Sequence, residues 1–183
     1  MTNVDPLEII QRHYDLDSKA YYFLVHHGRL VARKALEIAK KARHLNPDLK
    51  FMEEAAMLHD IGILFTNASK IGCHGRKEYI CHGYMGRELL EREGLPRHAL
   101  VCERHVGMGI TLRDIKDNRL PLPERDMVPE SIEEKIICYA DKFFSKSEHE
   151  LLREKDMESV RVLVKGFGED KLRTFDDWSR LFL

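Results

Sequence analysis

Apolar residues recur every three or four positions along most of this 183-residue chain, and that spacing constrains its fold more than any other feature. A period near 3.6 residues places apolar side chains on one face of a helix. No window shows the sustained alternation of apolar and polar residues that is typical of a half-buried strand. The sequence therefore predicts an all-α fold, a bundle of amphipathic helices around a shared interior.

Capping residues and helix breakers indicate where the predicted helices begin and end. Ser18 stands in an N-cap position, and Ser131 with Glu134 stands in capping-box register. Glycines, short polar residues and prolines interrupt the period at 66–76 and within 106–130, so we predict loops there that shape a pocket. The predicted helices cover about 6–14, 18–44, 51–59, 79–93, 96–105 and 131–144, and two more follow from about His149. Gly62, Gly83 and Gly86 are expected to end turns rather than to permit close helix approach.

Composition favours a cytoplasmic protein that acts on small molecules. The 30 basic and 31 acidic residues leave a formal charge of -1, so no overall field favours a nucleic-acid or membrane partner. No N-terminal secretory signal is recognisable, and no apolar run approaches the roughly 20 residues that span a bilayer. The four cysteines form no C-x-x-C pair, and we expect them to be reduced, buried thiols. The oligomeric state stays open.

Histidines and aspartates occupy positions on the apolar faces of the predicted helices. His27 lies three residues after Leu24 and four before Val31, so it shares their inward face. His59 follows apolar positions of its own helix by seven, four and three residues, and Asp60 comes directly after it. The same kind of spacing places three further side chains on apolar faces: His82, His105 and Asp141. We therefore expect one interior to receive four imidazoles and two carboxylates.

Two buried carboxylates need compensating positive charge, because an isolated one costs several kcal/mol or stays protonated. Metal ions would supply that charge. Imidazole and carboxylate ligands suit Fe, Mn, Zn, Co or Ni, and the absence of inward cysteine pairs disfavours a structural zinc site. The alternative is that each histidine is a hydrogen-bonded core residue, which is the common situation for a single one. Six such residues together favour a metal site.

The order and spacing of these residues follow a known pattern. The residues that carry it are His27 with Val31, His59-Asp60-Ile61-Gly62, His82-Gly83-Tyr84-Met85-Gly86, His105 and Ala140-Asp141-Lys142. This set resembles the HD superfamily of metal-dependent phosphohydrolases, in its HDIG subgroup, over about residues 20–146. The resemblance implies a helical-bundle HD domain as the single domain of 1–183, with additional C-terminal helices at 147–183.

The resemblance also implies the ligand sets. His27, His59, Asp60 and Asp141 would bind one ion. Members with two further histidines carry a second ion, and His82 and His105 stand at those places, with Asp60 bridging. We expect two divalent transition-metal ions per chain, with Fe or Mn preferred and with Zn, Co, Ni and Mg also compatible.

The implied reaction is hydrolysis of a phosphate ester or anhydride of a nucleotide-like small molecule by a metal-activated hydroxide. His59 and Asp60 would be the catalytic pair, with Asp60 orienting the nucleophile, and Lys142 and Arg113 would contact the phosphate. Ile63 stands where several hydrolytic members have Lys, and the GYP signature of cyclic-dinucleotide phosphodiesterases is missing. The second departure disfavours a cyclic-dinucleotide substrate.

Two alternatives use the same residues. A few members of the superfamily are di-iron oxygenases, which dioxygen-dependent turnover without phosphate release would identify. The other alternative is a non-catalytic module that binds a nucleotide or metal and signals through the C-terminal helices. The complete ligand set disfavours the module, because pure binding needs no open coordination positions.

Overall fold

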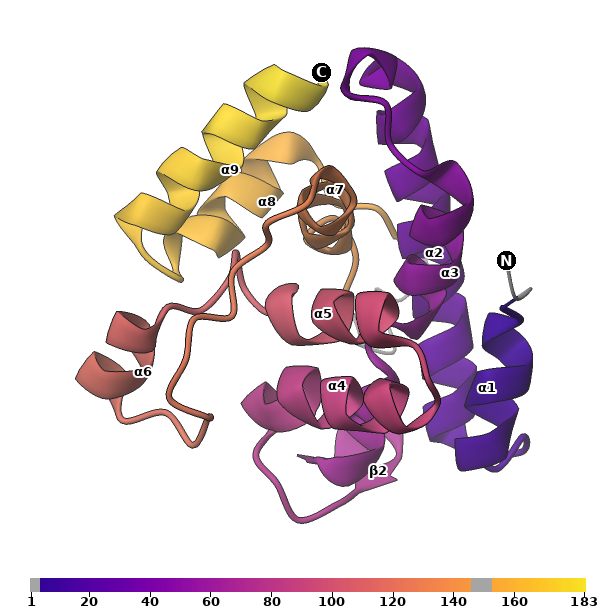
Figure 1. The fold of residues 1–183 in the computed structure, drawn as a ribbon. Helices are drawn as coiled ribbons and strands as arrows, with labels where there is room; N and C mark the ends of the chain where they lie inside the picture. Colours follow the sequence, from indigo (N-terminus) through magenta and orange to yellow (C-terminus); the bar gives the residue numbers. More distant parts are fainter. Residues whose placement is uncertain (1–3, 146–152) are drawn as a thin grey trace.

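Helices form nearly all of the regular structure in the computed structural model, which describes residues 4–145 and 153–183 (Figure 1). The α-helices are α1 (Pro6–His13), α2 (Lys19–Lys41), α3 (Leu49–Leu58), α4 (His82–Arg92), α5 (Pro96–Arg104), α6 (Leu112–Asn118), α7 (Ile132–Asp141), α8 (Met157–Lys165) and α9 (Glu169–Phe182). Short 3-10 helices are η1 (Arg43–Leu45), η2 (Ile61–Phe65), η3 (Ser69–Ile71) and η4 (Tyr79–Cys81). The all-α prediction is confirmed. The predicted start of the C-terminal tail at His149 lies outside the described residues.

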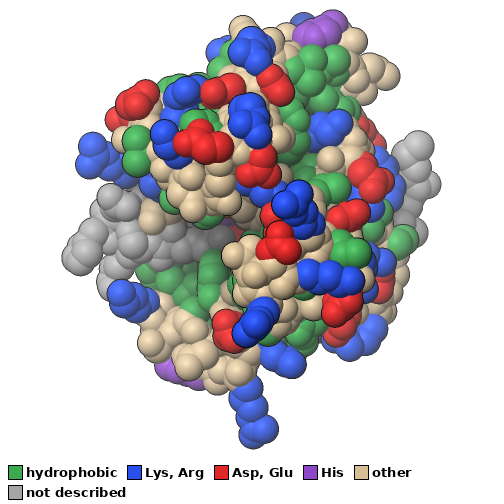
Figure 2. All heavy atoms as spheres, turned by 90° about the vertical axis from the view of Figure 1, so that its left-hand side faces the viewer, with side chains coloured by type: hydrophobic (Ala, Val, Ile, Leu, Met, Phe, Trp, Pro, Cys, Tyr) green, Lys and Arg blue, Asp and Glu red, His purple; other side chains and the backbone are tan. Residues whose placement is uncertain are grey.

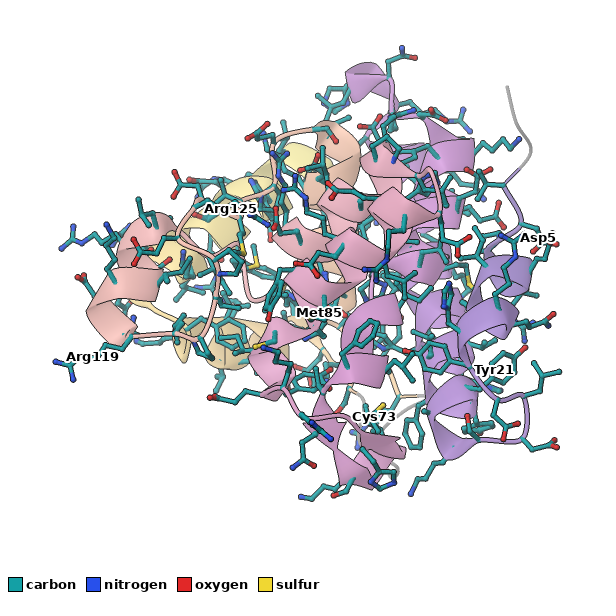
Figure 3. The ribbon with its side chains drawn as sticks, turned by 60° about the horizontal axis from the view of Figure 1, so that its bottom comes forward. Asp5, Tyr21, Cys73, Met85, Arg119 and Arg125 are labelled. Atoms are coloured by element: carbon teal, nitrogen blue, oxygen red, sulfur yellow. The ribbon has the colours of Figure 1, made fainter. Side chains whose placement is uncertain are left out.

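The predicted loop at 66–76 contains a small hairpin. Its strands β1 (Asn67–Ala68) and β2 (Cys73–His74) pair antiparallel. Figure 3 labels Cys73, the first residue of β2, in the lower part of the view. Each strand is two residues long, which is too short for an alternating pattern to appear in the sequence.

Side-chain caps set several helix starts. The Ser18 hydroxyl accepts a hydrogen bond from the Tyr21 amide at 3.1 Å, as its predicted N-cap role requires. The Ser131 hydroxyl accepts from the Glu134 amide at 3.2 Å, whereas the Glu134 carboxylate accepts from the Glu130 amide instead of closing a capping box. A complete capping box does occur at Thr111, where it begins α6.

Helix α7 lies at the centre of the bundle, where α2 packs on one side and α9 on another (Figure 1). The Tyr139 ring of α7 stacks on Phe175 of α9, with ring centroids 4.6 Å apart and planes 15° apart. The Tyr139 hydroxyl also lies 2.8 Å from the Ser179 hydroxyl. The C-terminal helices therefore hold α7, whose last residue is Asp141.

Three glycines bring η2, α4 and α5 unusually close, and our prediction that they merely end turns was wrong. A Cβ atom on Gly62 would lie 2.1 Å from the His82 carbonyl oxygen, and one on Gly86 would lie 2.9 Å from the Cys102 sulfur. A Cβ on Gly83 would lie 2.8 Å from a methyl carbon of Val106. Only a residue without a side chain permits this approach.

The four cysteines are buried and unbridged, as predicted. Among the residues that the structure describes, no helix combines the length and the apolar character that crossing a bilayer requires.

Candidate metal centre

The six predicted ligands come from five helices and meet in the interior. His27 lies within α2, where the apolar face carries it inward. The other five stand at helix ends: His59 caps α3 and is followed by Asp60, His82 begins α4, His105 caps α5 and Asp141 ends α7. All six are buried, and the most exposed of them, Asp141, shows 7% of its surface. Helix ends orient these side chains while the helices supply a rigid frame.

Four of these side chains form a first group of ligand atoms. The His27 Nε2 atom lies 2.9 Å from Asp141 Oδ1 and 3.3 Å from Asp60 Oδ2. The His59 Nε2 atom lies 3.2 Å from Asp60 Oδ2 and 3.4 Å from Asp141 Oδ1. Two nitrogens and two oxygens therefore surround one point.

A second group contains three ligand atoms. The Nε2 atoms of His82 and His105 lie 3.1 Å apart, and each lies 3.3 Å from Asp60 Oδ1. These atoms form one triangular face. Asp60 thus faces the first group with one carboxylate oxygen and the second group with the other.

The spacing of these atoms fits metal coordination. Nitrogen and oxygen ligands bound at usual distances in a tetrahedral or octahedral shell lie about 2.9 to 3.5 Å from one another. The separations given above, from 2.9 to 3.4 Å, match that range. In addition, the His59 Nε2 atom is buried and makes no hydrogen bond, which is costly unless another partner binds it. Each of the two groups could therefore hold one cation.

Backbone carbonyls set the orientation of three imidazoles. The Nδ1 atoms of His59, His82 and His105 lie 2.6, 2.6 and 2.7 Å from the carbonyl oxygens of residues 56, 79 and 102. Since a carbonyl only accepts, each Nδ1 carries a proton, and Nε2 is the ring nitrogen that faces the centre and that binds a cation in the neutral form of the ring. This arrangement is usual for histidines that bind metals.

The pKa values of His59 and His105 are shifted in opposite directions. Burial opposes a charged His59, but the Asp60 and Asp141 carboxylates outweigh that effect and raise the pKa of His59 to about 9. Burial lowers the pKa of His105 to about 3; the Asp60 carboxylate opposes this effect, and positive charge on His59 and His82 adds to it. His105 is therefore a neutral imidazole, the form that coordinates a cation.

The two predicted phosphate contacts have different surroundings. Lys142 is buried, and its Nζ atom donates to Asp141 Oδ2 at 2.5 Å and to the His105 carbonyl at 3.1 Å. The structure does not bring Arg113 to the centre: its side chain is 88% exposed on α6 and pairs with Asp117 at 3.2 Å. The helical turn that begins at Thr111 directs Arg113 to solvent, and the loop prediction for this segment did not anticipate that turn.

Two cavities open beside the centre and share four residues: Tyr79, Asp141, Lys142 and Phe167. The first has a volume of about 980 Å³ and is lined by several lysines and polar residues of the 67–70 segment. The second, of about 530 Å³, is lined by His82 and His105, by six apolar side chains and by polar and charged residues of α6, α7 and α9. The second ligand group is therefore accessible from a cavity of small-molecule size.

Several residues at the cavities, and one residue that supports the turn after Asp60, were not predicted from the sequence. Phe167 precedes α9, and Tyr79 lies in η4. Lys171 could have been identified from the sequence, because it lies four residues before Phe175 on the buried face of α9, where a lysine is unexpected. Tyr14 has no comparable signal in the sequence: its buried hydroxyl donates to the Ile61 carbonyl at 2.6 Å and accepts from the Leu64 amide at 3.0 Å, which fixes the turn after Asp60.

Comparison with known proteins gives relatives for part of the chain. A tRNA (cytidine(56)-2'-O)-methyltransferase of Thermoplasma volcanium is 34% identical over 124 residues, which are 67% of this chain and 32% of the relative. An uncharacterized protein of Methanocaldococcus jannaschii is 36% identical over 121 residues, 64% of either chain. The chain thus spans about one third of the first relative and just under two thirds of the second.

A solved structure and a family model identify the fold and the family. The crystal structure of the HD domain of the L. monocytogenes phosphodiesterase PgpH matches with a TM-score of 0.54 and 14% identity, over 96% of this chain and 95% of that one. At that identity the likeness shows a common fold. The HD domain family model matches residues 24–145, two thirds of the chain, and this range includes all six predicted ligands. The HDIG subgroup stays a prediction from the sequence. The chain belongs to the HD domain family.

Proposed function

We propose that this chain is a metal-dependent phosphohydrolase that cleaves a phosphate ester or anhydride of a nucleotide-like small molecule. One observation carries the proposal. A single buried carboxylate, Asp60, is shared by two groups of ligand atoms, and the second group opens on a cavity of about 530 Å³. Shared carboxylates between paired cations are suited to displacement at phosphorus.

The protein would hold two ions through different numbers of ligands. His27, His59, Asp60 and Asp141 would bind the first, and Asp60, His82 and His105 would bind the second. Bound ions of this kind lower the pKa of water and neutralise charge on phosphate oxygens. Asp60 would fix both positions relative to each other, because each of its oxygens belongs to one group.

The second position is the side from which substrate would approach. Its three ligand atoms form one face, and His82 and His105 line the cavity, so the opposite face is open to it. Catalytic sites keep such open positions, whereas structural sites close them with protein ligands.

The position of Lys142 is evidence for an anionic substrate. A buried ammonium group that lines both cavities offers a phosphate oxygen a charge-assisted hydrogen bond in a low-dielectric setting. Its contact with Asp141 Oδ2 also holds that carboxylate so that Oδ1 faces the first ligand group. We therefore assign Lys142 both a positioning and a phosphate-binding role.

We favour a small substrate over a nucleic acid. Among the described residues, basic and acidic side chains are intermixed over the face that carries α6 and α9 and form no continuous basic track there (Figure 2). The formal charge of -1 agrees with this distribution. The name of the methyltransferase relative refers to a protein about three times as long as the matched segment, and the phosphodiesterase with the same fold supports phosphate chemistry.

A substrate screen tests the function. Purified protein loaded with Mn²⁺ or Fe²⁺ is given nucleoside monophosphates, dinucleoside polyphosphates and simple phosphate esters, and phosphate release is measured. We expect hydrolysis of at least one nucleotide that a chelator abolishes and that Asp60→Ala eliminates. The matched control is Asp177→Ala, which removes a carboxylate that is 65% exposed on α9.

Three results would contradict the proposal. Phosphate release that persists after chelation would exclude metal dependence. Dioxygen consumption without phosphate release would identify the oxygenase alternative instead. Tight nucleotide binding with no turnover under any metal would identify the non-catalytic module.

A further inference from the structure

We propose that the second cavity binds the base of the substrate nucleotide and that Phe167 is the residue on which this planar ring stacks. The inference rests on the proposed function, because it places the phosphate at the ligand groups that form one end of the cavity. His82, His105 and Asp141 lie at that end. Lys142 lies beside Asp141, and the remainder of the lining comes from η4, the 106–110 segment, α6 with Leu120 after it, the α8–α9 connection and α9.

The walls of this cavity suit an uncharged, largely apolar group. Apolar side chains that line it are Ile80, Val106, Met108, Ile110, Leu120 and Phe167. Polar side chains also line the cavity: Asp114, Asn118, Asp141, Lys142 and Lys171. Against the six apolar side chains, a sugar or polyol would leave hydroxyl groups without hydrogen bonds, which is unfavourable. A flat heterocycle instead buries its faces against them and keeps its polar edge for the rim.

The charges at the far end exclude a second phosphate. The Lys171 ammonium lies 2.8 Å from Asp114 Oδ2 and 2.9 Å from the Gly109 carbonyl oxygen. The Asp114 carboxylate would repel a phosphate placed there. Unlike Asp141, which pairs with Lys142, Asp114 belongs to neither ligand group, so no bound cation would offset its charge. Further phosphates would find a better environment in the first cavity, whose lining includes Lys19, Lys70 and Lys155.

The cavity wall is held in place by the protein itself. Ile110 and Met127 exchange two backbone hydrogen bonds of 3.0 and 2.8 Å, which attach the 106–110 segment to the following loop. Gly109 adopts a φ of +87°, and a Cβ atom there would lie 2.8 Å from Pro129 Cδ. Helix α6 forms the outer part, and its capping residue Arg119 extends away from the molecule in Figure 3. A preformed wall lowers the entropy cost of binding.

Phe167 is the more exposed of the two residues, Phe167 and Tyr79, whose aromatic rings lie at the opening of this cavity. Its side chain is 48% exposed although it is fully apolar, and Tyr79 is 37% exposed at the same opening. The Tyr79 ring already packs on His82, with centroids 4.7 Å apart. The Phe167 ring is therefore the better candidate for stacking, because a base stacked on it would bury its exposed apolar surface.

The test compares ligands that differ only in the base. The four nucleoside 5'-monophosphates and ribose 5-phosphate are supplied to the metal-loaded full chain, and kcat/KM is measured for each. We expect at least one nucleotide to exceed ribose 5-phosphate roughly ten-fold, and Phe167→Ala to reduce that ratio roughly ten-fold. Leu120→Ala, which removes a second wall residue, should reduce the ratio in the same direction.

Tyr22→Ala is the matched control, because Tyr22 is an aromatic residue with the same 48% exposure that lines neither cavity. Calorimetric binding of the corresponding non-hydrolysable phosphonates, with and without the base, gives a readout independent of turnover. If no ester is hydrolysed, the proposed function fails. Tighter binding of the nucleoside phosphonate than of the ribose phosphonate would still support a base site in the second cavity. Equal binding of both phosphonates, or equal losses in Phe167→Ala and Tyr22→Ala, would overturn the inference.

Discussion

Gly62→Ala tests the link between close helix approach and the second ligand group. The added Cβ would lie 2.1 Å from the His82 carbonyl oxygen and 2.4 Å from the Gly86 amide nitrogen. Both atoms belong to the backbone of α4, so no side-chain rotation relieves the clash. Ordinary contact at 3.4 Å requires η2 and α4 to separate by about 1.3 Å. The Asp60 Oδ1–His82 Nε2 separation of 3.3 Å would then exceed the spacing of ligands on one ion.

The expected loss of stability is about 3 kcal/mol, at the upper end for an overpacked core, which corresponds to a Tm lower by about 6 to 12 °C. Thermal unfolding and elemental analysis of the purified variant measure both effects, and we expect close to one ion per chain instead of two. Gly166→Ala is the control, since its Cβ would approach only the Leu163 carbonyl, at 3.1 Å, far along the chain from the ligands. A Gly62→Ala protein with wild-type Tm and two ions would refute the reasoning.

Three further substitutions separate the contributions of single residues. Asp60→Ala should remove both ions, because each carboxylate oxygen serves one group, and elemental analysis would show it. His82→Ala should lower the stoichiometry from about two ions to about one and abolish phosphate release; retention of two ions would argue against the second group. Tyr14→Phe should cost about 1–3 kcal/mol in chemical denaturation, because the Ile61 carbonyl and the Leu64 amide both lose their bond to its hydroxyl. An unchanged midpoint and slope would exclude that contribution.

The sequence could predict which residues meet at the candidate metal centre, because these residues lie on apolar helix faces and are also titratable. Helical spacing placed His27 on the face of Leu24 and Val31, and the structure buries all three. His59, His105 and Asp141 stand at or next to helix ends, yet each continues the apolar face of its helix. Burial of a charged residue on such a face needs a partner, so the pattern carries chemical as well as structural information.

The cavities could not be predicted in the same way, because their walls depend on contacts between distant segments. Helix α6 is seven residues long and follows two glycines with positive φ, Gly107 and Gly109, so its sequence resembles a loop. Lys171 meets Asp114 only because α9 packs beside α7. The close approach at Gly62 is likewise a property of the tertiary structure, since its φ is not in the left-handed region that marks a required glycine.

The two ligand groups should release their ions in a fixed order. The first group has four ligand atoms, from α2, the end of α3 and α7, and Lys142 supports its Asp141. The second has three, and it depends on the contact of η2 with α4 and opens on a cavity. Two of the three residues of the second group line the cavity, against Asp141 alone of the four in the first group. Fewer ligands and greater access both weaken binding, so a chelator should remove the second ion first and eliminate activity while about one ion remains. Timed samples analysed for metal content and phosphate release would show activity lost with the first ion. Activity that persists until the last ion leaves would mean that the four-ligand group alone suffices for hydrolysis.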